Sequence, residues 1–268
     1  MFLSIYIKEK GGGYILLINE RHQKILEILQ KEKTVSTKKI QESLYISEAT
    51  VRRDLTKMEQ KGLIKRTYGG ATIVESLSDE SSFIIREQTQ IKEKKKIALK
   101  AMDFIQNNTS YFLDSSSTVS HLLYYFPHFK DLTVVTNSFN NAMILLQNHN
   151  SKIYFTPGIV YSRTNCVLGA DSLDYIRKFN CDYFFFSCSG LSLNQGVTEA
   201  SFEQSLIKKE MLLNSKTHIL LADHTKFNKI FLCGSCNFDD IDYIITDKEP
   251  DDSYLKVFNK ANIKLVIA

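Results

Sequence analysis

The stretch STKKIQESLYISEATVRRDLTKMEQKGLIKRTYGGA, residues 36–71, decides the fold of the first part of the chain. It opens on a serine, a typical helix N-cap, and Ile40 and Leu44 follow at a spacing that places both on one helix face. Ser47 can cap another helix, so little more than Tyr45-Ile46 separates the two. The stretch therefore predicts two short helices joined by a tight turn.

The second of these helices is followed by a glycine-tipped hairpin. Val51, Leu55 and Met58 are spaced i, i+4 and i+7, which is the buried stripe of a helix, and Gly62 ends the pattern. Residues 63–74 have the pattern of two short strands around a glycine turn. Helix, tight turn, helix and hairpin form the layout of a winged helix-turn-helix domain, whose second helix enters the major groove of DNA.

Small, hydroxyl and basic side chains lie on the outward face of this second helix. Arginine can bind guanine bidentately, and threonine can contact a thymine methyl group or a phosphate. A solvated helix with surface charges is the alternative, and Arg52-Arg53 would not exclude it without the helices and the hairpin. RNA is disfavoured, because the sequence lacks the aromatic-studded sheet and glycine loop of common RNA modules. The predicted DNA contacts are Ser36, Ser47, Ala49, Thr50, Arg52, Arg53, Thr56, Lys57, Lys65 and Arg66.

Charge is distributed unevenly along the chain. Its 268 residues suggest about two domains at roughly 150 residues each, and 43% hydrophobic and 24% charged residues exclude collagen-like and disordered chains. Residues 1–75 hold 14 Lys and Arg against 9 Asp and Glu, whereas the remainder holds 20 against 21. The first module is therefore basic and attracts polyanions, of which nucleic acid is the commonest.

Nothing in the sequence directs the chain out of the cytoplasm. No apolar run approaches the roughly 18–20 residues that span a bilayer, and the start lacks the basic region of a signal peptide. The five cysteines are irregularly spaced, which argues against a disulfide framework. Cys233 and Cys236 form a lone CxxC in an apolar stretch. Half a zinc site is the alternative there, but we expect ordinary thiols, no metal and no cofactor.

Strand and helix patterns alternate from Ile97 to the end of the chain. This alternation predicts an α/β domain with a doubly wound, mainly parallel sheet covered by helices on both faces. The predicted strands are Tyr111–Leu113, Leu132–Val135, Ile153–Phe155, Tyr183–Phe186, Ile219–Ala222, Ile241–Ile245 and Leu265–Ile267. The predicted helices are Val119–Phe126, Phe139–Gln147, Leu173–Phe179, Phe202–Asn214 and Tyr254–Lys260.

Polar loops follow most of these strands. In an open parallel sheet, ligands bind beyond the carboxyl ends of the strands. Helix capping is the alternative for any single loop, but several such loops on one edge predict a small-molecule site. The first loop has the composition of a phosphate cradle. The loops are Asp114-Ser115-Ser116-Ser117-Thr118, Thr136-Asn137-Ser138, Thr156-Pro157-Gly158, Ser187-Cys188-Ser189-Gly190, Asp223 with Lys226, and Asp247.

Residues 1–18 differ from the rest of the chain. No helical period continues across Gly11–Gly13. A purine-rich ribosome-binding sequence would read similarly when translated, so we expect a mis-assigned start, with the native protein beginning near Leu16 or Leu17. An ordered strand extension is the alternative.

The remaining boundaries follow from composition. We expect the winged helix-turn-helix domain over residues 19–75 and the sensor domain over residues 97–268. Residues 76–96 are polar and predict a linker or the entry to a helix. The lysine-rich run 92–96 is expected to form a solvated helix face.

The basic module resembles a known family. Glu20–Ile25, Ser47–Leu55 and Gly62–Ala71 are similar to the N-terminal signature of DeoR-type bacterial transcriptional repressors, and the resemblance continues through Phe83–Arg86 to cover about residues 19–268. The resemblance implies a C-terminal domain that is similar to ribose-5-phosphate isomerase and senses phosphorylated sugars.

The resemblance also completes the expected effector site. It adds Glu203 and Lys208. Two positions depart from the family pattern: the family's first loop usually carries Gly where this chain has Ser116, and its Gly-Gly pair is Pro157-Gly158 here. Ser116 adds a hydroxyl and restricts the backbone. The expected effector contacts are Asp114, Ser115, Ser116, Ser117, Thr118, Thr136, Asn137, Gly158, Ser189, Gly190, Glu203, Lys208, Asp223 and Lys226.

The sequence thus predicts a DNA-binding transcriptional regulator. We expect a repressor of a sugar-utilisation operon that a phosphorylated sugar releases from its operator. We also expect a homo-oligomer (dimer or tetramer), because winged helix-turn-helix domains usually bind DNA as symmetric pairs. The alternative is a sugar-phosphate isomerase-like enzyme with a DNA-binding domain, since acid and lysine side chains at strand ends also suit proton transfer. A DNA-architectural protein is a third reading, but it leaves the loops unexplained.

Overall fold

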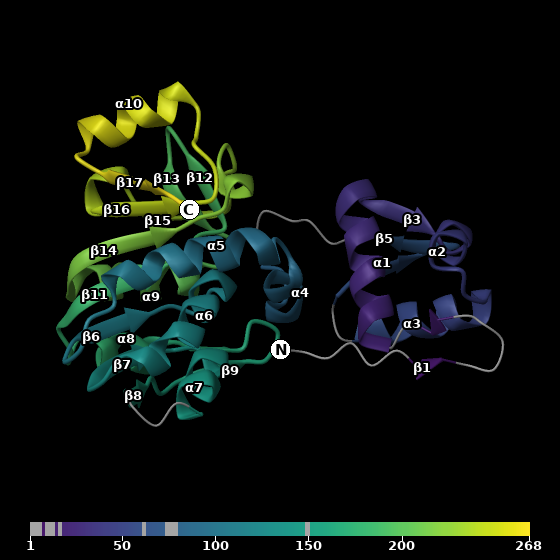
Figure 1. The fold of residues 1–268 in the computed structure, drawn as a ribbon, viewed down its shortest axis with the longest axis horizontal. Coiled ribbons are helices and arrows are strands. Elements are labelled where there is room, and N and C mark those ends of the chain that lie inside the picture. Colours follow the sequence, from purple (N-terminus) through teal and green to yellow (C-terminus); the bar gives the residue numbers. More distant parts are fainter. Residues whose placement is uncertain (1–6, 9–13, 16–17, 61–62, 73–79, 148–150) are drawn as a thin grey trace. The chain divides into compact units, whose positions relative to one another are not determined.

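The chain divides into two compact units, Met1–Glu75 and Ser76–Ala268 (Figure 1). The computed structural model describes residues 7–8, 14–15, 18–60, 63–72, 80–147 and 151–268. Gly11–Gly13 and Gly62, to which we gave roles above, lie outside the described residues. Within 1–18, strand β1 (Ile7–Lys8) pairs antiparallel with β2 (Tyr14–Ile15).

The described residues of the first unit include three helices, namely α1 (Ile18–Glu32), α2 (Thr37–Leu44) and α3 (Glu48–Gln60). Both predicted serine caps are confirmed, because the Oγ atoms of Ser36 and Ser47 each accept a backbone N–H at 3.2 Å. The predicted turn is also confirmed, and the chain leaves α2 through a left-handed residue, Tyr45, with φ of 53°. Helix α1 extends to Glu32.

The predicted hairpin is present as β4 (Lys65–Thr67) and β5 (Gly70–Thr72). A third strand, β3 (Thr34–Ser36), pairs with β5 on the side away from β4. We did not predict β3, because three residues directly before a helix cap are too few to show an alternating pattern.

An ion pair holds α1 against α3. Val51, Leu55 and Met58 are fully buried, as their spacing predicts. On the same helix Asp54 is buried as well, and its carboxylate accepts from Arg21 Nε at 2.7 Å and from Arg21 Nη2 at 3.0 Å. Such a bidentate pair fixes orientation as well as distance, so it fixes how α3 is presented.

The second unit contains all seven predicted strands in one parallel sheet. The order is β17-β16-β14-β11-β6-β7-β8, so the connections run one way from β6 and the other way from β11. This doubly wound topology has its switch point between those two strands. The bounds are β6 Ser110–Leu113, β7 Leu132–Thr136, β8 Ser151–Phe155, β11 Cys181–Phe186, β14 Ser215–Leu221, β16 Tyr243–Thr246 and β17 Lys264–Ile267.

Helices cover both faces of this sheet (Figure 1). Along β11, Phe184 and Phe186 pack into one apolar cluster, while Phe185 packs into another on the opposite face. A parallel sheet buried on both faces has continuous apolar strands, which is why its strands were readable from sequence. The covering helices are α5 (Ile91–Ala101), α6 (Ser117–Leu122), α7 (Phe139–Leu146), α8 (Ala170–Ile176), α9 (Phe202–Leu213) and α10 (Asp252–Lys260), with a 3-10 helix at Leu123–His128.

Part of the stretch expected as a linker is helical. Residues 83–88 form α4 (Phe83–Gln88), capped by Ser82, and α5 begins at Ile91. The lysine-rich run is not wholly solvated either, because Lys94 is buried on the inner face of α5. Short antiparallel strands also escaped prediction, namely β9 (Ile159–Tyr161), β10 (Cys166–Leu168), β12 (Gly190–Ser192), β13 (Gly196–Glu199) and β15 (Cys233–Cys236).

In the part of the chain that the structure describes, no helix has the length and apolarity to cross a membrane. The described His, Cys, Asp and Glu side chains likewise form no group of three or more that could hold a metal ion. Cys233 and Cys236 are half-buried free thiols on β15.

Candidate functional site

The outward face of α3 carries the side chains expected to meet DNA. Ala49, Arg53 and Lys57 are exposed, while the opposite face of the helix is buried. Among the described residues, neither Arg53 nor Lys57 has a hydrogen-bond or ion-pair partner. These cations therefore project from the helix without an internal counter-charge.

Other predicted DNA contacts are engaged within the unit. Arg52 donates to Glu48 Oε1 from Nη2 at 2.7 Å, on an exposed part of α3. Arg66 Nη1 donates to Thr56 Oγ1 at 3.0 Å, which ties the hairpin to α3. Lys65 is exposed beside it. These pairs are exposed, so a phosphate could compete for the arginines at small cost.

Sequence reasoning missed two exposed tyrosines. Tyr45, at the turn before α3, has a relative exposure of 94%, and Tyr68, at the hairpin tip, has one of 110%. Each lies next to elements that carry predicted DNA contacts. No periodicity marks a single aromatic residue in a turn, so the sequence offered no signal for either.

Asp114, at the carboxyl end of β6, organises a cluster of polar side chains in the second unit. It is buried, and its Oδ1 accepts from the backbone N–H of Ser116 at 2.9 Å. Its Oδ2 accepts from the N–H of Ser187, after β11, at 3.1 Å. The carboxylate thus joins the loops on the two sides of the topological switch point.

Lys208 of α9 meets the same carboxylate. Its Nζ lies 3.1 Å from Asp114 Oδ2 and 2.5 Å from Glu199 Oε1, and it donates to the carbonyl of Ser187 at 2.6 Å. Burial would lower the pKa of Lys208, but Glu199 and Asp114 outweigh it and raise the pKa. The ammonium therefore donates two hydrogen bonds and lies against a second carboxylate inside the protein.

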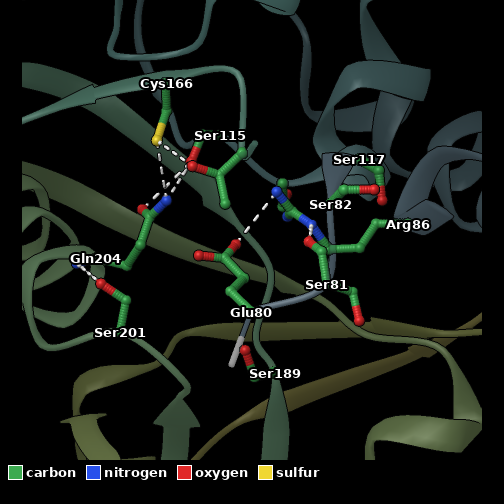
Figure 2. A network of polar contacts seen from close by, with 12 residues as sticks. Glu80, Ser81, Ser82, Arg86, Ser115, Ser117, Cys166, Ser189, Ser201 and Gln204 are labelled. Atoms are coloured by element: carbon green, nitrogen blue, oxygen red, sulfur yellow. Dashed lines mark hydrogen bonds and ion pairs between the residues drawn. The ribbon is translucent and has the colours of Figure 1, made fainter. Parts of the chain in front are cut away.

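The structure brings Gln204, rather than Glu203, into the cluster. Gln204 Nε2 donates to Ser115 Oγ at 3.0 Å and to Cys166 Sγ at 3.2 Å (Figure 2). Glu203 is exposed at the start of α9 and accepts from Ser201 Oγ at 2.8 Å. The first loop is thus fixed by an amide on the turn where the resemblance had implied a carboxylate.

A buried lysine that we had not predicted adjoins the first loop. Lys94 Nζ donates to Ser117 Oγ at 2.9 Å and to the carbonyl of Arg86. Burial and the positive charge of Lys226 lower the pKa of Lys94 to about 7, while Asp223 acts in the opposite sense. The signal was present: Lys94 precedes Ile97, Ala98 and Ala101 at i+3, i+4 and i+7 on the buried face.

Asp223 and Lys226 follow β14 and face this lysine. Asp223 Oδ1 accepts from the N–H of Thr225 at 3.0 Å. Burial would raise the pKa of Asp223, but Lys226, Thr225 and Lys94 together lower it. The carboxylate is therefore ionised beside two cations, and Lys226 remains partly exposed.

Within the first loop, the serines and Thr118 differ in their contacts. Ser116 Oγ caps α6 by accepting from the N–H of Val119 at 3.3 Å. Thr118 is buried, yet among the described residues its hydroxyl has no hydrogen-bond partner. The loop therefore retains a hydroxyl that is not committed to the fold.

The remaining predicted effector residues lie at neighbouring strand ends. Thr136 Oγ1 donates to the carbonyl of Leu113 at 2.7 Å, and Asn137 Nδ2 donates to the carbonyl of Val167 at 3.1 Å. Ser189 Oγ donates to Glu199 Oε2 at 2.8 Å. Asn137 Oδ1 is buried and has no hydrogen bond among the described residues, so it is an acceptor without a donor.

Two predicted positions require glycine. Gly158 has φ of +138°, and a Cβ there would lie 2.6 Å from the carbonyl oxygen of Leu168. A Cβ at Gly190 would lie 2.5 Å from the carbonyl oxygen of Lys229. Both glycines permit close backbone approach at the edge of the cluster.

Family models match both units. A DeoR-like helix-turn-helix domain matches residues 21–77, and the DeoR C terminal sensor domain matches residues 89–248. The HTH-type transcriptional regulator IolR of Bacillus subtilis is 33% identical over 254 residues, covering 92% of this chain and 98% of that protein. The glycerol-3-phosphate regulon repressor of Escherichia coli is 29% identical over 246 residues, covering 92% and 97%. The L-fucose operon activator of Haemophilus influenzae is 30% identical over 250 residues, covering 93% and 100%.

Solved structures are more distant. Ribose 5-phosphate isomerase from Plasmodium falciparum is 18% identical with a TM-score of 0.37, covering 50% of this chain and 52% of that one. The eIF2B beta structure from Chaetomium thermophilum is 15% identical with a TM-score of 0.42, covering 92% and 70%. The sequence matches, by contrast, extend over a winged helix-turn-helix unit and a doubly wound unit in the order that the fold shows, and the chain belongs to the DeoR family of DNA-binding transcriptional regulators.

Proposed function

We propose that the protein represses a sugar-utilisation operon and leaves its operator when a phosphorylated sugar binds the sensor unit. One observation carries the proposal: a helix with unpaired basic side chains and a buried polar cluster at a sheet's switch point occur in a single chain. Two relatives are named for glycerol-3-phosphate and L-fucose regulation, which supports a small phosphorylated or hydroxylated effector. Bacterial operator DNA lies in the cytoplasm, where we expect the protein to act.

Operator DNA is bound through α3 and the hairpin. Arg53 is the best candidate to read a base, because it is exposed and unpartnered among the described residues. Lys57 and Lys65 are exposed cations suited to phosphates. Ser36, Ser47, Ala49, Thr50, Arg52, Thr56 and Arg66 complete the proposed surface.

The effector's phosphate is held by the first loop and Lys226. The uncommitted hydroxyl of Thr118 and the partly exposed ammonium of Lys226 support this assignment. The sugar hydroxyls then face the loops that hold Asn137, Gly158 and Ser189. Lys208, which is buried and paired with Asp114 and Glu199, positions the loops instead of touching the ligand.

The same contacts support binding without turnover. An isomerase needs a carboxylate free to move a proton and a cation free to stabilise an enediolate. Asp114 accepts two backbone N–H groups and adjoins Lys208, whose ammonium is buried and also paired with Glu199. These contacts support a sensor, and conversion of a pentose or hexose phosphate by the purified protein would contradict it.

We also propose that the protein works as a homo-oligomer, a dimer or tetramer, on a symmetric operator. Light scattering on the purified protein would give its molar mass, and a monomer that still protects a two-fold operator would contradict this part.

Two linked experiments test the function. Affinity selection from a randomised DNA duplex library identifies the operator, and a thermal-shift screen of sugar phosphates identifies the effector. Enrichment of a two-fold symmetric sequence and a selective rise in Tm are the expected results. Failure to enrich any sequence would contradict operator recognition, and a screen without a stabilising sugar phosphate would contradict the effector class.

The variant Thr118→Val then assigns the phosphate loop. It removes one hydroxyl and keeps the shape, so a lost charge-assisted hydrogen bond of about 1.5–3 kcal/mol would weaken the effector roughly 10–150-fold. Operator affinity without effector should stay unchanged. Thr133→Val, near the amino end of β7, is the matched control, and a normal response of folded Thr118→Val would place the phosphate elsewhere.

A further inference from the structure

We infer that Arg86 is an anion-binding residue of the effector site, and that Glu80 occupies its guanidinium as an internal anion which the effector's phosphate displaces. This inference rests on the function proposed above and adds a residue pair and a regulatory step to it. Neither residue was among the predicted contacts, because both lie in the stretch expected to be a linker.

The carboxylate of Glu80 lies inside the polar cluster. Glu80 Oε1 is 3.1 Å from Arg86 Nη2, and the two side chains are only 13% and 19% exposed. Figure 2 shows Glu80 directed toward Arg86. Burial raises the pKa of both Cys166 and Glu199, and the negative charge of Glu80 adds to each rise.

This ion pair differs from the buried group that Lys208 forms with Asp114 and Glu199. Among the described residues, Arg86 is the one charged partner of Glu80, and Arg86 Nη2 makes no aligned hydrogen bond. Arg86 is nevertheless held in place, since its Nε donates to the carbonyl of Ser81 at 3.1 Å and its guanidinium lies 5.6 Å from the centre of the Phe83 ring. A fixed guanidinium with unused donors fits the oxygens of a phosphate better than one carboxylate.

The surrounding charge also favours a dianion. Lys94 bonds to the carbonyl of Arg86, and the positive charges of Lys226 and Arg86 contribute to the lowered pKa of Lys94. Three basic side chains thus converge beside the first loop. Asp223 and Glu87 oppose the charge of Lys94, and Glu80 pairs with Arg86. A phosphate that replaces Glu80 brings one more negative charge to the same cations, which compensates them more fully.

Displacement of Glu80 would reach the connection between the two units. The second unit begins at Ser76, so Glu80 is one of its first residues and lies directly before α4. When Glu80 leaves Arg86, the stretch before α4 loses an anchor in the sensor unit. An effector can shift a conformational equilibrium only through such differential contacts.

The test compares charge-removing variants of the full-length protein by calorimetric titration. The probes are the sugar phosphate that stabilises the wild type most and, in parallel, inorganic phosphate. If Glu80 occupies Arg86 in nine molecules of ten, it weakens apparent affinity about tenfold. Glu80→Gln should therefore bind the sugar phosphate about tenfold more tightly, and Arg86→Gln should bind it at least tenfold more weakly. Asp171→Asn, which removes an exposed charge on α8, should match the wild type.

The outcomes separate this inference from the proposed function. If the wild type binds the sugar phosphate and Glu80→Gln binds it no more tightly, the inference is overturned and the proposed function stands. If the wild type binds no sugar phosphate, the proposed effector class is wrong, and the inference is judged on inorganic phosphate: tighter binding by Glu80→Gln supports it and equal affinity overturns it. Should Arg86→Gln fail to fold, hydrogen exchange in wild-type residues 80–88 decides. Faster exchange with bound phosphate supports displacement, and unchanged exchange overturns it.

Discussion

Removing the ammonium of Lys208 should destabilise the sensor unit in a pH-dependent way. In Lys208→Met, the carboxylates of Asp114 and Glu199 lose the cation that lies 3.1 Å and 2.5 Å from them. Breaking a buried pair from one side costs about 3–5 kcal/mol, because the remaining charge is buried without compensation. In a unit of this size each kcal/mol lowers Tm by about 2–4 °C, so we expect a decrease of roughly 6–20 °C.

The pH dependence distinguishes lost charge from lost packing. Burial already raises the pKa of Glu199, and loss of the positive charge of Lys208 raises it further above its unfolded value. The unit then loses stability as pH rises through the folded pKa, because the folded state binds the proton more tightly. Lys208→Met should therefore be closer to wild type at pH 5 than at pH 8.

Urea denaturation followed by circular dichroism measures this effect. The two units give separate transitions, and hydrogen exchange in α9 identifies the one that belongs to the sensor unit. Lys209→Met is the matched control, since Lys209 is the exposed neighbour on the same helix. A Lys208→Met protein as stable as Lys209→Met, or equally destabilised at pH 5 and pH 8, would refute the reasoning.

Three further predictions follow from named contacts. Arg53→Ala should weaken operator binding by about 1–3 kcal/mol and relax specificity at one base pair, whereas Lys65→Ala should weaken binding to all DNA sequences alike and reduce the salt slope by about 1. Fluorescence anisotropy over a salt series measures both effects. An unchanged footprint for Arg53→Ala would remove Arg53 from the recognition surface. Asp54→Ala removes the buried carboxylate to which Arg21 donates at 2.7 Å. The free energy of unfolding of the first unit, measured by urea denaturation, should therefore fall by about 3 kcal/mol. An unchanged transition of the first unit would show that the pair does not hold α1 to α3. Because the pKa of Lys94 is lowered to about 7, the bound anion should draw a proton onto Lys94 above that pH, and effector affinity should fall as pH rises from 7 to 9. Calorimetry in two buffers measures the proton uptake, which Lys94→Arg should abolish. Binding by the wild type that does not depend on pH would contradict a Lys94 contact.

The fold could be predicted where burial makes apolar residues recur at a regular spacing or in continuous runs. The seven parallel strands are apolar because helices cover both faces, and the α3 stripe is apolar because it faces the first unit's core. Short elements were not readable. A strand of three residues, such as β3 or β9, shows no period, and its existence depends on a partner strand that is distant in sequence.

The sequence predicted which edge of the sheet carries the candidate site, but not which side chains contact one another there. The polar loops at the strand ends were predicted, since parallel strands bring their carboxyl ends together. Which side chain carries the contact was not: Gln204 takes the place expected for Glu203, and Lys208 turns inward. Lys94, Arg86 and Glu80 were missed because charge was read as a sign of solvent. For Lys94 the apolar residues at i+3, i+4 and i+7 argued otherwise.

The most direct test of the account is the coupling between the two ligands. Operator affinity is measured by fluorescence anisotropy with and without saturating sugar phosphate, and sugar-phosphate affinity by calorimetry with and without saturating operator. Linkage requires both factors to be equal, and a coupling of about 1–3 kcal/mol makes each roughly 5–150-fold. We predict that the sugar phosphate weakens operator binding by the same factor by which the operator weakens sugar-phosphate binding. Operator and sugar phosphate that each bind with an affinity unchanged by the other would contradict the account.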